Sequence, residues 1–355
     1  NAAQQNSSCL MTKKYLAGLL LLFCLLAFRN HTPDAVPPKI KLSEYGFFEG
    51  PMANLKPTDR VFPYELNAPL FTDYAHKSRF IRLPENTTIG YQSNGPLAFP
   101  IGTVLIKNFY YPADSRKPTE KRRILETRLL VHEANGWKAL PYIWNVDQTD
   151  AVLEVAGGRL DISWTQPDGT TQNLNYVVPN MNQCKGCHES ELRITPIGPS
   201  AKQLNLSGPD GQNQLAGWAS AGWLRELPSP TDLPKLADYR NTNLPLADRA
   251  RAYLDGNCAH CHNPKGPGST SGLFLDTSET DPAKLGVFKA PIAAGKGAGN
   301  LQFSILPGKP ESSILVYRMQ SLDPGVMMPE LGRKMVDQEG VALIRNWIRG
   351  MKASE

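Results

Sequence analysis

The chain has 355 residues, of which 41% are hydrophobic and 20% charged, and its formal net charge is +5 at pH 7. This length allows two or three domains, and the apolar content excludes a largely disordered chain. Residues 1–35 hold three basic residues and one acidic residue, so the remainder carries 35 basic and 32 acidic residues, a net charge of +3. Such a small excess gives no support to nucleic-acid binding.

The N-terminal region has the pattern of an export signal. Lys13 and Lys14 precede an apolar run, residues 16–28, which is too short to span a bilayer comfortably. We therefore expect residues 1–35 to comprise upstream residues and a signal peptide, and the mature protein to be periplasmic. An uncleaved segment that associates with the membrane is an alternative, because no small-x-small cleavage pattern follows the run.

From residue 64 to residue 178, β-branched and aromatic runs alternate with glycine, proline, asparagine and aspartate. This pattern is typical of antiparallel strands, which we expect at residues 102–111, 124–132, 158–164 and 174–178. Asn135-Gly136 and Asp168-Gly169 lie where hairpin turns are needed. The sequence thus predicts a β-rich domain, an antiparallel sandwich or barrel, over residues 36–240. The proline-rich residues 195–246 are expected to form an irregular linker.

The pattern Cys-x-x-Cys-His occurs twice, first directly after the last expected strand, in a short helix or loop packed on the sheet, and again beyond the linker. Two thiols about one helical turn apart can reach the two vinyl groups of one porphyrin, while the adjacent imidazole reaches the iron. A zinc site or a redox dithiol would not require that histidine. The pattern therefore predicts two covalently bound haem c groups, held by Cys184, Cys187, His188, Cys258, Cys261 and His262.

Helical patterns dominate the end of the chain. Residues 246–257 place apolar side chains on one stripe and end just before the second motif. A shorter helix is expected to start near residues 310–313, and a last one to cover residues 338–351, where Val341, Ile344 and Ile348 face the core.

A helix leading into Cys-x-x-Cys-His, a Gly/Pro loop, a Met-Pro segment and a closing amphipathic helix resemble class I cytochrome c over residues 246–352. The resemblance implies an all-α cytochrome c domain, residues 241–355, with His262 as the proximal ligand and Met328 as the distal one. Met327 competes with Met328. A soft, neutral thioether raises the reduction potential relative to a second histidine. In that family a carbonyl of a Gly-Pro segment orients the proximal ring, and Pro267 matches that segment here.

The distal ligand of the first haem is less obvious, with His188 expected as its proximal ligand. The preferred candidate is His76, because it ends a proline-flanked stretch, residues 62–76, that we expect to be a loop free to fold over a cofactor. A surface role for His76 stays open, and His132, Met52 and Met181 are the other candidates. His260, inside the second motif, is expected at the surface or beside a propionate.

A second resemblance concerns the first half of the chain. Residues 99–107, Gly136-Trp137 and the strands that end at the first motif are similar to the cytochrome P460 and c′-β group, whose haem iron has an open face. This resemblance implies that the first iron could bind a small molecule. The whole chain resembles a family of exported bacterial dihaem c-type cytochromes, which implies the architecture but no substrate.

The sequence thus favours a dihaem cytochrome that transfers electrons in the periplasm between redox protein partners, a carrier more than a catalyst, with no catalytic residue assigned. The alternative is a haem oxidoreductase, or a binder of a gas, nitrogen oxide or peroxide, at an open first haem to which the second relays electrons. A third hypothesis is a docking module in which the haems take no part in the function.

Overall fold

The computed structural model describes residues 37–208, 211–292 and 294–352. The expected signal peptide and membrane-associated segment, residues 1–35, lie outside these ranges. Residues Pro38–Glu355 form one compact unit. Of the helices in the described ranges, none is both long enough and apolar enough to cross a membrane.

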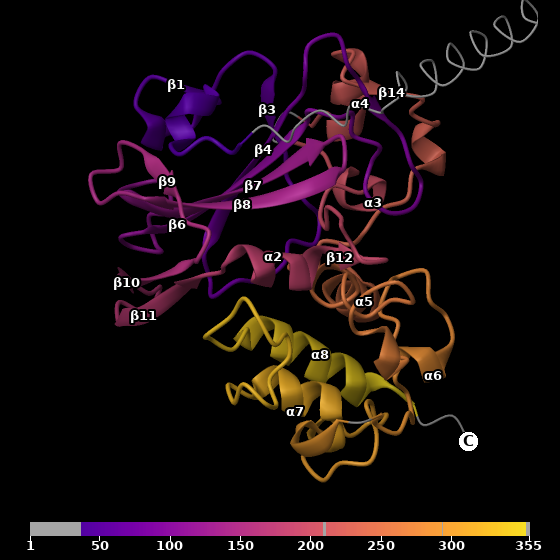
Figure 1. Cartoon of the computed structure of the whole chain (residues 1–355). Helices are drawn as coiled ribbons and strands as arrows, with labels where there is room; N and C mark the ends of the chain where they lie inside the picture. Colours follow the sequence, from indigo (N-terminus) through magenta and orange to yellow (C-terminus); the bar gives the residue numbers. More distant parts are fainter. Residues whose placement is uncertain (1–36, 209–210, 293, 353–355) are drawn as a thin grey trace, which may run out of the picture. The chain divides into compact units, whose positions relative to one another are not determined.

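A six-stranded antiparallel sheet organises the first half of the chain (Figure 1). The strand order has two edges, β3 and β9, so the sheet is open and is not the closed barrel that the sequence also allowed. Ala134 and Asn135 form the turn between β7 and β8, and Gly136, which begins β8, has a φ of 118° that glycine adopts readily. The turn thus lies one residue before the Asn135-Gly136 pair expected from the sequence. The strands are β3 (Val61–Pro63), β4 (His76–Arg82), β6 (Val104–Pro112), β7 (Arg122–Glu133), β8 (Gly136–Trp144) and β9 (Ala151–Leu153).

Shorter strands pair outside this sheet. The hairpin of β10 (Gly158–Thr165) and β11 (Thr171–Val178) turns at Asp168-Gly169, as the sequence predicts. The remaining pairs are β1 (Phe48–Glu49) with β2 (Lys56–Pro57), β5 (Ile89–Gly90) with β14 (Leu224–Arg225), and β12 (Glu189–Ser190) with β13 (Arg193–Ile194).

The two faces of the six-stranded sheet differ in character. One face is apolar, with Phe80, Ile106 and Leu129 in a single core. The other face carries two apolar clusters and, between them, a row of charged side chains on three adjacent strands. We call this row the charged band. Arg79 pairs with Lys107 and Lys107 with Arg128 across the strands, and side chains two residues apart share a face. The band consists of Lys77, Arg79, Lys107, Glu126 and Arg128.

Helices are concentrated in the second half. Helix α5 covers the predicted range and α8 ends one residue before it, whereas α7 follows the short turn η6. The α-helices of the described residues are α2 (Met181–His188), α3 (Ala201–Leu204), α4 (Gln214–Ser220), α5 (Leu246–Asn257), α6 (Pro282–Leu285), α7 (Ile314–Gln320) and α8 (Gln338–Gly350). The 3-10 helices are η1 (Leu42–Tyr45), η2 (Met52–Asn54), η3 (Pro230–Asp232), η4 (Ser269–Ser271), η5 (Gly295–Ala298) and η6 (Pro310–Ser312).

Helices α5 and α8 pack against each other in the core of this half. Tyr253 of α5 donates from its hydroxyl to Asp337 Oδ2 at 2.9 Å, at the start of α8. A Cβ on Gly340 would come within 2.5 Å of three atoms of the Tyr253 side chain, so only glycine allows this approach. The helix that leads into the second motif is thereby fixed to the last helix.

The prediction of an irregular linker over residues 195–246 is wrong in part. Helices α3 and α4 place Leu204, Leu215 and Trp218 in a core shared with the sheet residue Leu105. Asn213 caps α4 by accepting from the backbone N–H groups of Leu215 and Ala216. Helices form in this proline-rich region because their apolar side chains are buried and because α4 has an N-terminal cap.

Residues 67–74, which we call the strap, fasten the first half to the helices. The backbone N–H of Phe71 donates to Asn257 Oδ1 at 2.7 Å. Asp73 Oδ1 accepts from the N–H groups of Lys334 and Met335, each at 2.7 Å. Tyr74 donates to Glu339 Oε2 at 2.9 Å. The sequence predicted that this stretch would be free to fold over a cofactor. Instead, hydrogen bonds to residues of the second half hold it in place.

Candidate haem-attachment site

The first motif lies on α2, which begins with a reciprocal cap. Asn180 Oδ1 accepts from Gln183 N at 2.8 Å, and Gln183 Oε1 accepts from Asn180 N at 3.0 Å. Because residues three apart share a helix face, Cys184 and Cys187 lie one turn apart on the same side. Helix α2 packs on β8, as the sequence predicts.

His188, the last residue of α2, is held in one tautomer. Its Nδ1 lies 2.9 Å from the carbonyl oxygen of Thr195, so Nδ1 carries the proton and Nε2 is free to bind a metal. Burial lowers the pKa of His188 to about 4; the bond to Thr195 opposes this effect, and the charges of Lys107 and Arg128 add to it. The ring is therefore neutral at pH 7, as an iron ligand must be.

The second motif continues from the end of α5 and fixes its histidine in the same way. His262 Nδ1 lies 3.1 Å from Ser271 Oγ, and that hydroxyl donates to Gly268 O at 2.6 Å. The hydroxyl must then accept from Nδ1–H, which again leaves Nε2 free. The orienting partner expected from the resemblance was the carbonyl of Pro267. The structure assigns that role to Ser271, four residues further on.

The four thiols are free and protonated. Burial raises the pKa of Cys258 and Cys261 to about 12, and it also raises the pKa of Cys184 and Cys187. A redox dithiol requires an accessible thiolate, so this environment disfavours that alternative. Within the described ranges, His, Cys, Asp and Glu side chains form no group of three or more suited to a metal ion.

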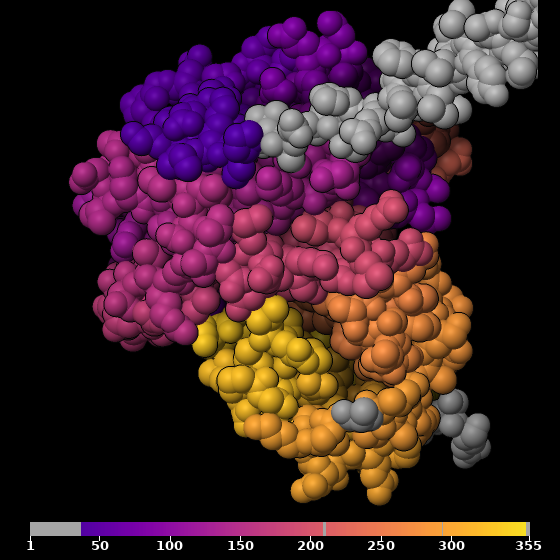
Figure 2. Space-filling view, viewed as in Figure 1, coloured from indigo at the N-terminus to yellow at the C-terminus, as the bar shows by residue number. Residues whose placement is uncertain are grey.

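The two motifs lie side by side. The charge of Cys187 contributes to the raised pKa of Cys261, and the charge of His188 to the lowered pKa of His260. Just beyond the motifs, Glu191 N donates to Lys265 O at 3.1 Å, and their side chains form an ion pair at 2.8 Å. In Figure 2 the pink segment that includes residues 185–200 borders the orange segment that includes residues 250–290. One site therefore contains both motifs.

The charged band faces the first motif. The charge of Arg128 acts on Cys184, and the charges of Lys107 and Arg128 act on Cys187. Burial, followed by the nearby charges of Arg79, Lys77 and Arg128, lowers the pKa of Lys107 well below its usual value. Yet Lys107, His188 and Cys187 each keep some accessible surface, and Arg128 is 25% exposed. These side chains are therefore partly buried and keep some contact with solvent.

This donor set fits covalent haem. Each motif supplies two protonated thiols and an imidazole with a free Nε2, and the basic side chains near the first motif would pair with propionates. The fixed tautomers of His188 and His262 support this fit, because a histidine that binds iron donates its other ring N–H to a nearby acceptor.

The predicted distal ligand Met328 lies on a loop next to the second motif. Its N–H donates to Arg318 O at 3.0 Å, and its carbonyl accepts from Arg333 Nη2 at 3.0 Å. Burial, then the charge of Arg318, lowers the pKa of His262, so this loop and the proximal histidine share one neighbourhood. Met327 is 7% exposed and Met328 is partly exposed, and both remain candidates.

The structure does not bring His76 to His188. His76 is the first residue of β4, and its ring stacks on Tyr110 with centroids 5.4 Å apart. Its neighbour Lys77 points to the opposite face, into the charged band beside the first motif, and side chains alternate along a strand. His76 therefore faces away from that motif.

The other three sequence candidates are also engaged elsewhere. His132 stacks on Trp137 at 4.4 Å, and its Nδ1 lies 3.2 Å from Pro100 O. Met52 and Met181 pack against the core on the face that His76 shares. Sequence reasoning also missed the tautomer-fixing residues Thr195 and Ser271, which carry no motif of their own.

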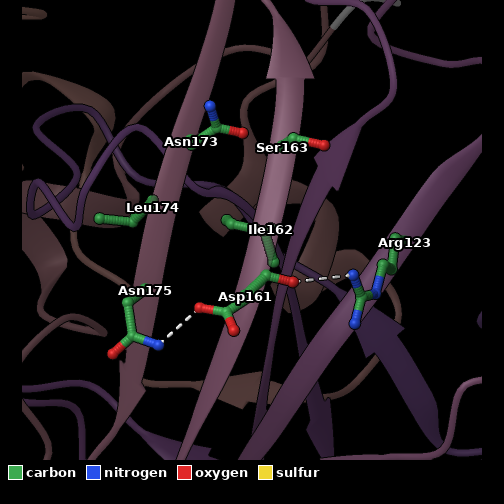
Figure 3. Close-up of a pocket in the computed structure, with 7 residues that line it drawn as sticks. All are labelled: Arg123, Asp161, Ile162, Ser163, Asn173, Leu174 and Asn175. Atoms are coloured by element: carbon green, nitrogen blue, oxygen red, sulfur yellow. Dashed lines mark hydrogen bonds between the residues drawn. The ribbon is translucent and has the colours of Figure 1, made fainter.

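A surface pocket on the β10–β11 hairpin contains none of the motif residues (Figure 3). Arg123 Nη1 donates to Asp161 O at 3.2 Å, and Asn175 Nδ2 donates to Asp161 Oδ1 at 2.7 Å. Its polar groups thus bond to one another. The lining residues are Arg123, Asp161, Ile162, Ser163, Asn173, Leu174 and Asn175.

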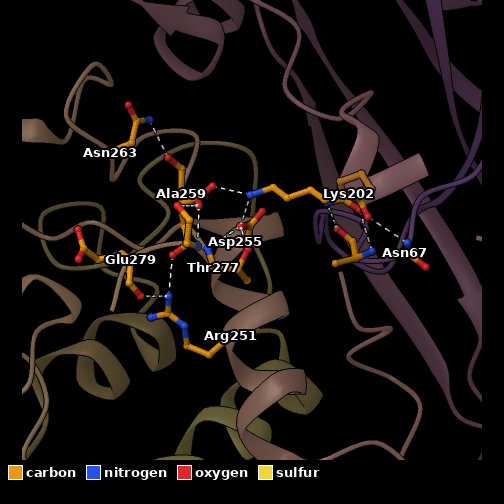
Figure 4. Close-up of polar contacts among 12 residues, drawn as sticks. Asn67, Lys202, Arg251, Asp255, Ala259, Asn263, Thr277 and Glu279 are labelled. Atoms are coloured by element: carbon orange, nitrogen blue, oxygen red, sulfur yellow. Dashed lines mark hydrogen bonds and ion pairs between the residues drawn. The ribbon is translucent and has the colours of Figure 1, made fainter. Parts of the chain in front are cut away.

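A buried polar network positions α5 ahead of the second motif (Figure 4). Lys202 of α3 pairs with Asp255 Oδ2 at 2.5 Å and also with Asp276. Asp255 Oδ2 accepts in addition from Thr277 N at 2.8 Å. Burial lowers the pKa of Lys202, but the carboxylate of Asp255 raises it, and the net effect is a pKa above the usual value. The lysine therefore stays charged.

Lys202→Met is expected to lower the free energy of unfolding by about 2–4 kcal/mol, because the buried carboxyl group of Asp255 would lose its ion-pair partner. Denaturant unfolding measures the loss. The control is Lys117→Met, which removes an exposed ion pair to Glu120 at 3.5 Å and should cost less than about 1 kcal/mol. Equal stability of the two variants would contradict the role given to Lys202.

Comparison of the chain with known protein families, with curated proteins and with solved structures returned no match.

Proposed function

We propose that this protein is an exported dihaem c-type cytochrome that transfers electrons between redox protein partners. One observation carries the proposal: two Cys-x-x-Cys-His motifs, each with its histidine fixed in the iron-binding tautomer, lie side by side. A haem at each motif would supply reversible one-electron chemistry. Two neighbouring redox centres in one chain suit electron transfer between partners.

Each residue of the two motifs has a proposed role. Cys184 and Cys187 attach one haem, and Cys258 and Cys261 the other, while His188 and His262 offer Nε2 to the irons. Thr195 and Ser271 hold these rings in orientation. Met328 is the proposed distal ligand of the second haem.

The second half is proposed to be a class I cytochrome c domain. Support comes from the order of its parts, since α5 leads into the motif, the Met-Pro loop follows, and α8 closes on α5. The approach of Gly340 to Tyr253 fixes the crossing of these two helices. An exported, periplasmic location rests on the sequence alone.

The test is to produce the full chain in cells with haem-attachment machinery and to measure its intact mass. We expect the mass of two haems above the mature chain, and two one-electron steps in a redox titration. Cys184→Ala/Cys187→Ala and Cys258→Ala/Cys261→Ala should each remove one haem. Met52→Leu is the control and should retain both. A colourless product, or fewer than two haems on the wild-type chain, would refute the proposal.

A second function is favoured by one feature of the first motif. The distal ligands predicted for it from the sequence have contacts elsewhere, and Lys107 and Arg128 lie near it. An open iron beside cations would suit a small anionic or neutral ligand. Carbon monoxide binding by the reduced wild-type protein would support this function, and its absence would exclude an open first iron.

A further inference from the structure

The Met-Pro loop, residues 321–337 between α7 and α8, is held together from within by one arginine. Arg333 is 5% exposed. Its Nη2 donates to Ser321 O at 2.8 Å and to Met328 O at 3.0 Å, and its Nη1 donates to Met335 O at 3.2 Å. One guanidinium therefore joins both ends of the loop to the backbone of Met328, and the loop moves as a unit.

This loop packs against the first half of the chain. Met335 joins the core cluster that contains Phe109 of β6 and Leu125 of β7. Leu331 lies against the first motif, since a Cβ added to Gly186 would come 3.7 Å from Leu331 Cδ1. The loop that carries Met328 thus contacts both the six-stranded sheet and the helix of the first motif.

Asp73 of the strap adds a polar link at the same place. Its Oδ1 accepts from the backbone N–H groups of Lys334 and Met335, each at 2.7 Å, and the residue is 3% exposed. Hydrogen bonds to a carboxylate are stronger than those between neutral groups. Loss of this acceptor would leave two amides of the loop without a partner, which is costly in a buried place.

The backbone around Asp73 aims its carboxyl group at the loop. Asp73 has a φ of 45° and Tyr74 a φ of 62°, and two consecutive left-handed residues that are not glycine are rare. Such conformations persist only where the surrounding structure holds them. Here Ala75 N donates to Thr72 O at 2.8 Å, and the hydroxyl of Tyr111 donates to Asp73 O. The turn is therefore fixed before it meets the loop.

We propose that Asp73 is a positioning residue for the distal ligand of the second haem. Arg333 fixes Met328 within the Met-Pro loop, and Asp73 fixes that loop to the first half. This inference rests on the proposed function and deepens it. Its consequence is that the axial ligation of the second haem depends on the β-rich half, so the helical half does not set the properties of its own haem alone.

The test uses the full, haem-loaded chain and two measurements. Hydrogen exchange followed by mass spectrometry reports on the Met-Pro loop, and added imidazole, which competes for the distal position, is titrated against the thioether-to-iron charge-transfer band. Asp73→Ala should speed exchange of the loop. It should also lower the imidazole concentration that removes the band by about tenfold, the factor that corresponds to roughly 1.4 kcal/mol.

Two variants serve as controls. Asp73→Asn keeps an oxygen acceptor and tolerates the left-handed backbone, so it should behave like the wild type. Asn67→Ala changes another buried residue of the strap, 6% exposed, whose Nδ2 donates to Asn205 O at 3.0 Å within the first half. It should leave both the exchange of the loop and the imidazole titration unchanged.

Unchanged exchange or an unchanged imidazole titration in Asp73→Ala would overturn the role of Asp73, as would an equal effect of Asn67→Ala. If Asp73→Ala does not accumulate, wild-type exchange still tests the role: the amides of Lys334 and Met335 should exchange more slowly than that of Leu331, and the reverse order would overturn it. The haem count and the wild-type band are read first, because their absence contradicts the proposed function, whereas exchange alone decides whether Asp73 holds the loop.

Discussion

Glu126→Ala is expected to lower the free energy of unfolding by about 3–5 kcal/mol, the loss typical of a buried ion pair that keeps one partner. Glu126 is fully buried and accepts from Arg128 Nε at 2.8 Å and Nη2 at 2.5 Å. Its Oε1 also accepts from the hydroxyl of Tyr176 at 2.5 Å. Alanine would leave Arg128 among cations without its carboxylate, and Tyr176 without an acceptor.

Denaturant unfolding of the haem-loaded chain measures this loss. The matched control is Glu120→Ala, because Glu120 is 61% exposed and meets the exposed Lys117 at 3.5 Å, so it should cost less than about 1 kcal/mol. Adding Arg128→Met to Glu126→Ala should recover part of the loss, since no unpaired charge would then remain. A double variant less stable than Glu126→Ala would show that Arg128 stabilises the fold by other contacts.

Glu126 belongs to the charged band, which faces the first motif. Glu126 is its one acidic member, whereas Lys77, Arg79, Lys107 and Arg128 are basic. Burial, followed by the charges of Arg79 and Arg128, lowers the pKa of Lys77 to about 7, so positive charge is unfavourable here unless an anion lies close to it. The propionates of a haem attached at Cys184 and Cys187 would supply such anions, which gives the band a reason to face the first motif.

Local patterns in the sequence predicted several of the longer elements. Strands β6, β7, β10 and β11 and the turn after β7 follow from alternation and turn chemistry, which act over a few residues, whereas β8 was not among the expected strands. Helix α5 matches its prediction because its apolar stripe is regular. Helices α3 and α4 were missed, since their stability depends on a core shared with distant strands. The strap was missed for the same reason, because Asn257 and Lys334, which bind Phe71 and Asp73, lie more than 180 residues away along the chain.

The site was predictable only where its chemistry is local. Both motifs are contiguous, so spacing alone predicts haem attachment at Cys184, Cys187, Cys258 and Cys261, and this stays a prediction. Which way His76 faces depends on its register in β4, and a shift of one residue reverses the face. The same limit applies to Thr195 and Ser271, whose contacts with His188 and His262 are made by turns that no motif marks. His260 was expected at the surface or beside a propionate; its Nδ1 is buried, which the motif alone does not reveal.

Met328→Ala is expected to lower the reduction potential of the second haem by about 0.1–0.2 V, a fraction of the roughly 0.8 V that axial ligands control. Thioether sulfur is neutral and soft, and it favours the reduced iron; a water molecule in its place would not. The thioether-to-iron charge-transfer band should disappear at the same time. Arg318 and Arg333 hold the backbone of Met328, so the loop should keep its place in the variant.

Potentiometric titration followed by optical spectra measures both effects, and the first haem of the same molecule is the internal reference. Met327→Ala is the matched control: Met327 is 7% exposed, so its loss should destabilise the loop and leave the band intact. If Met327→Ala removes the band and Met328→Ala keeps it, the ligand is Met327. A band that survives both variants would mean that neither methionine binds the iron, and the Met-Pro segment would then no longer support a class I cytochrome c domain.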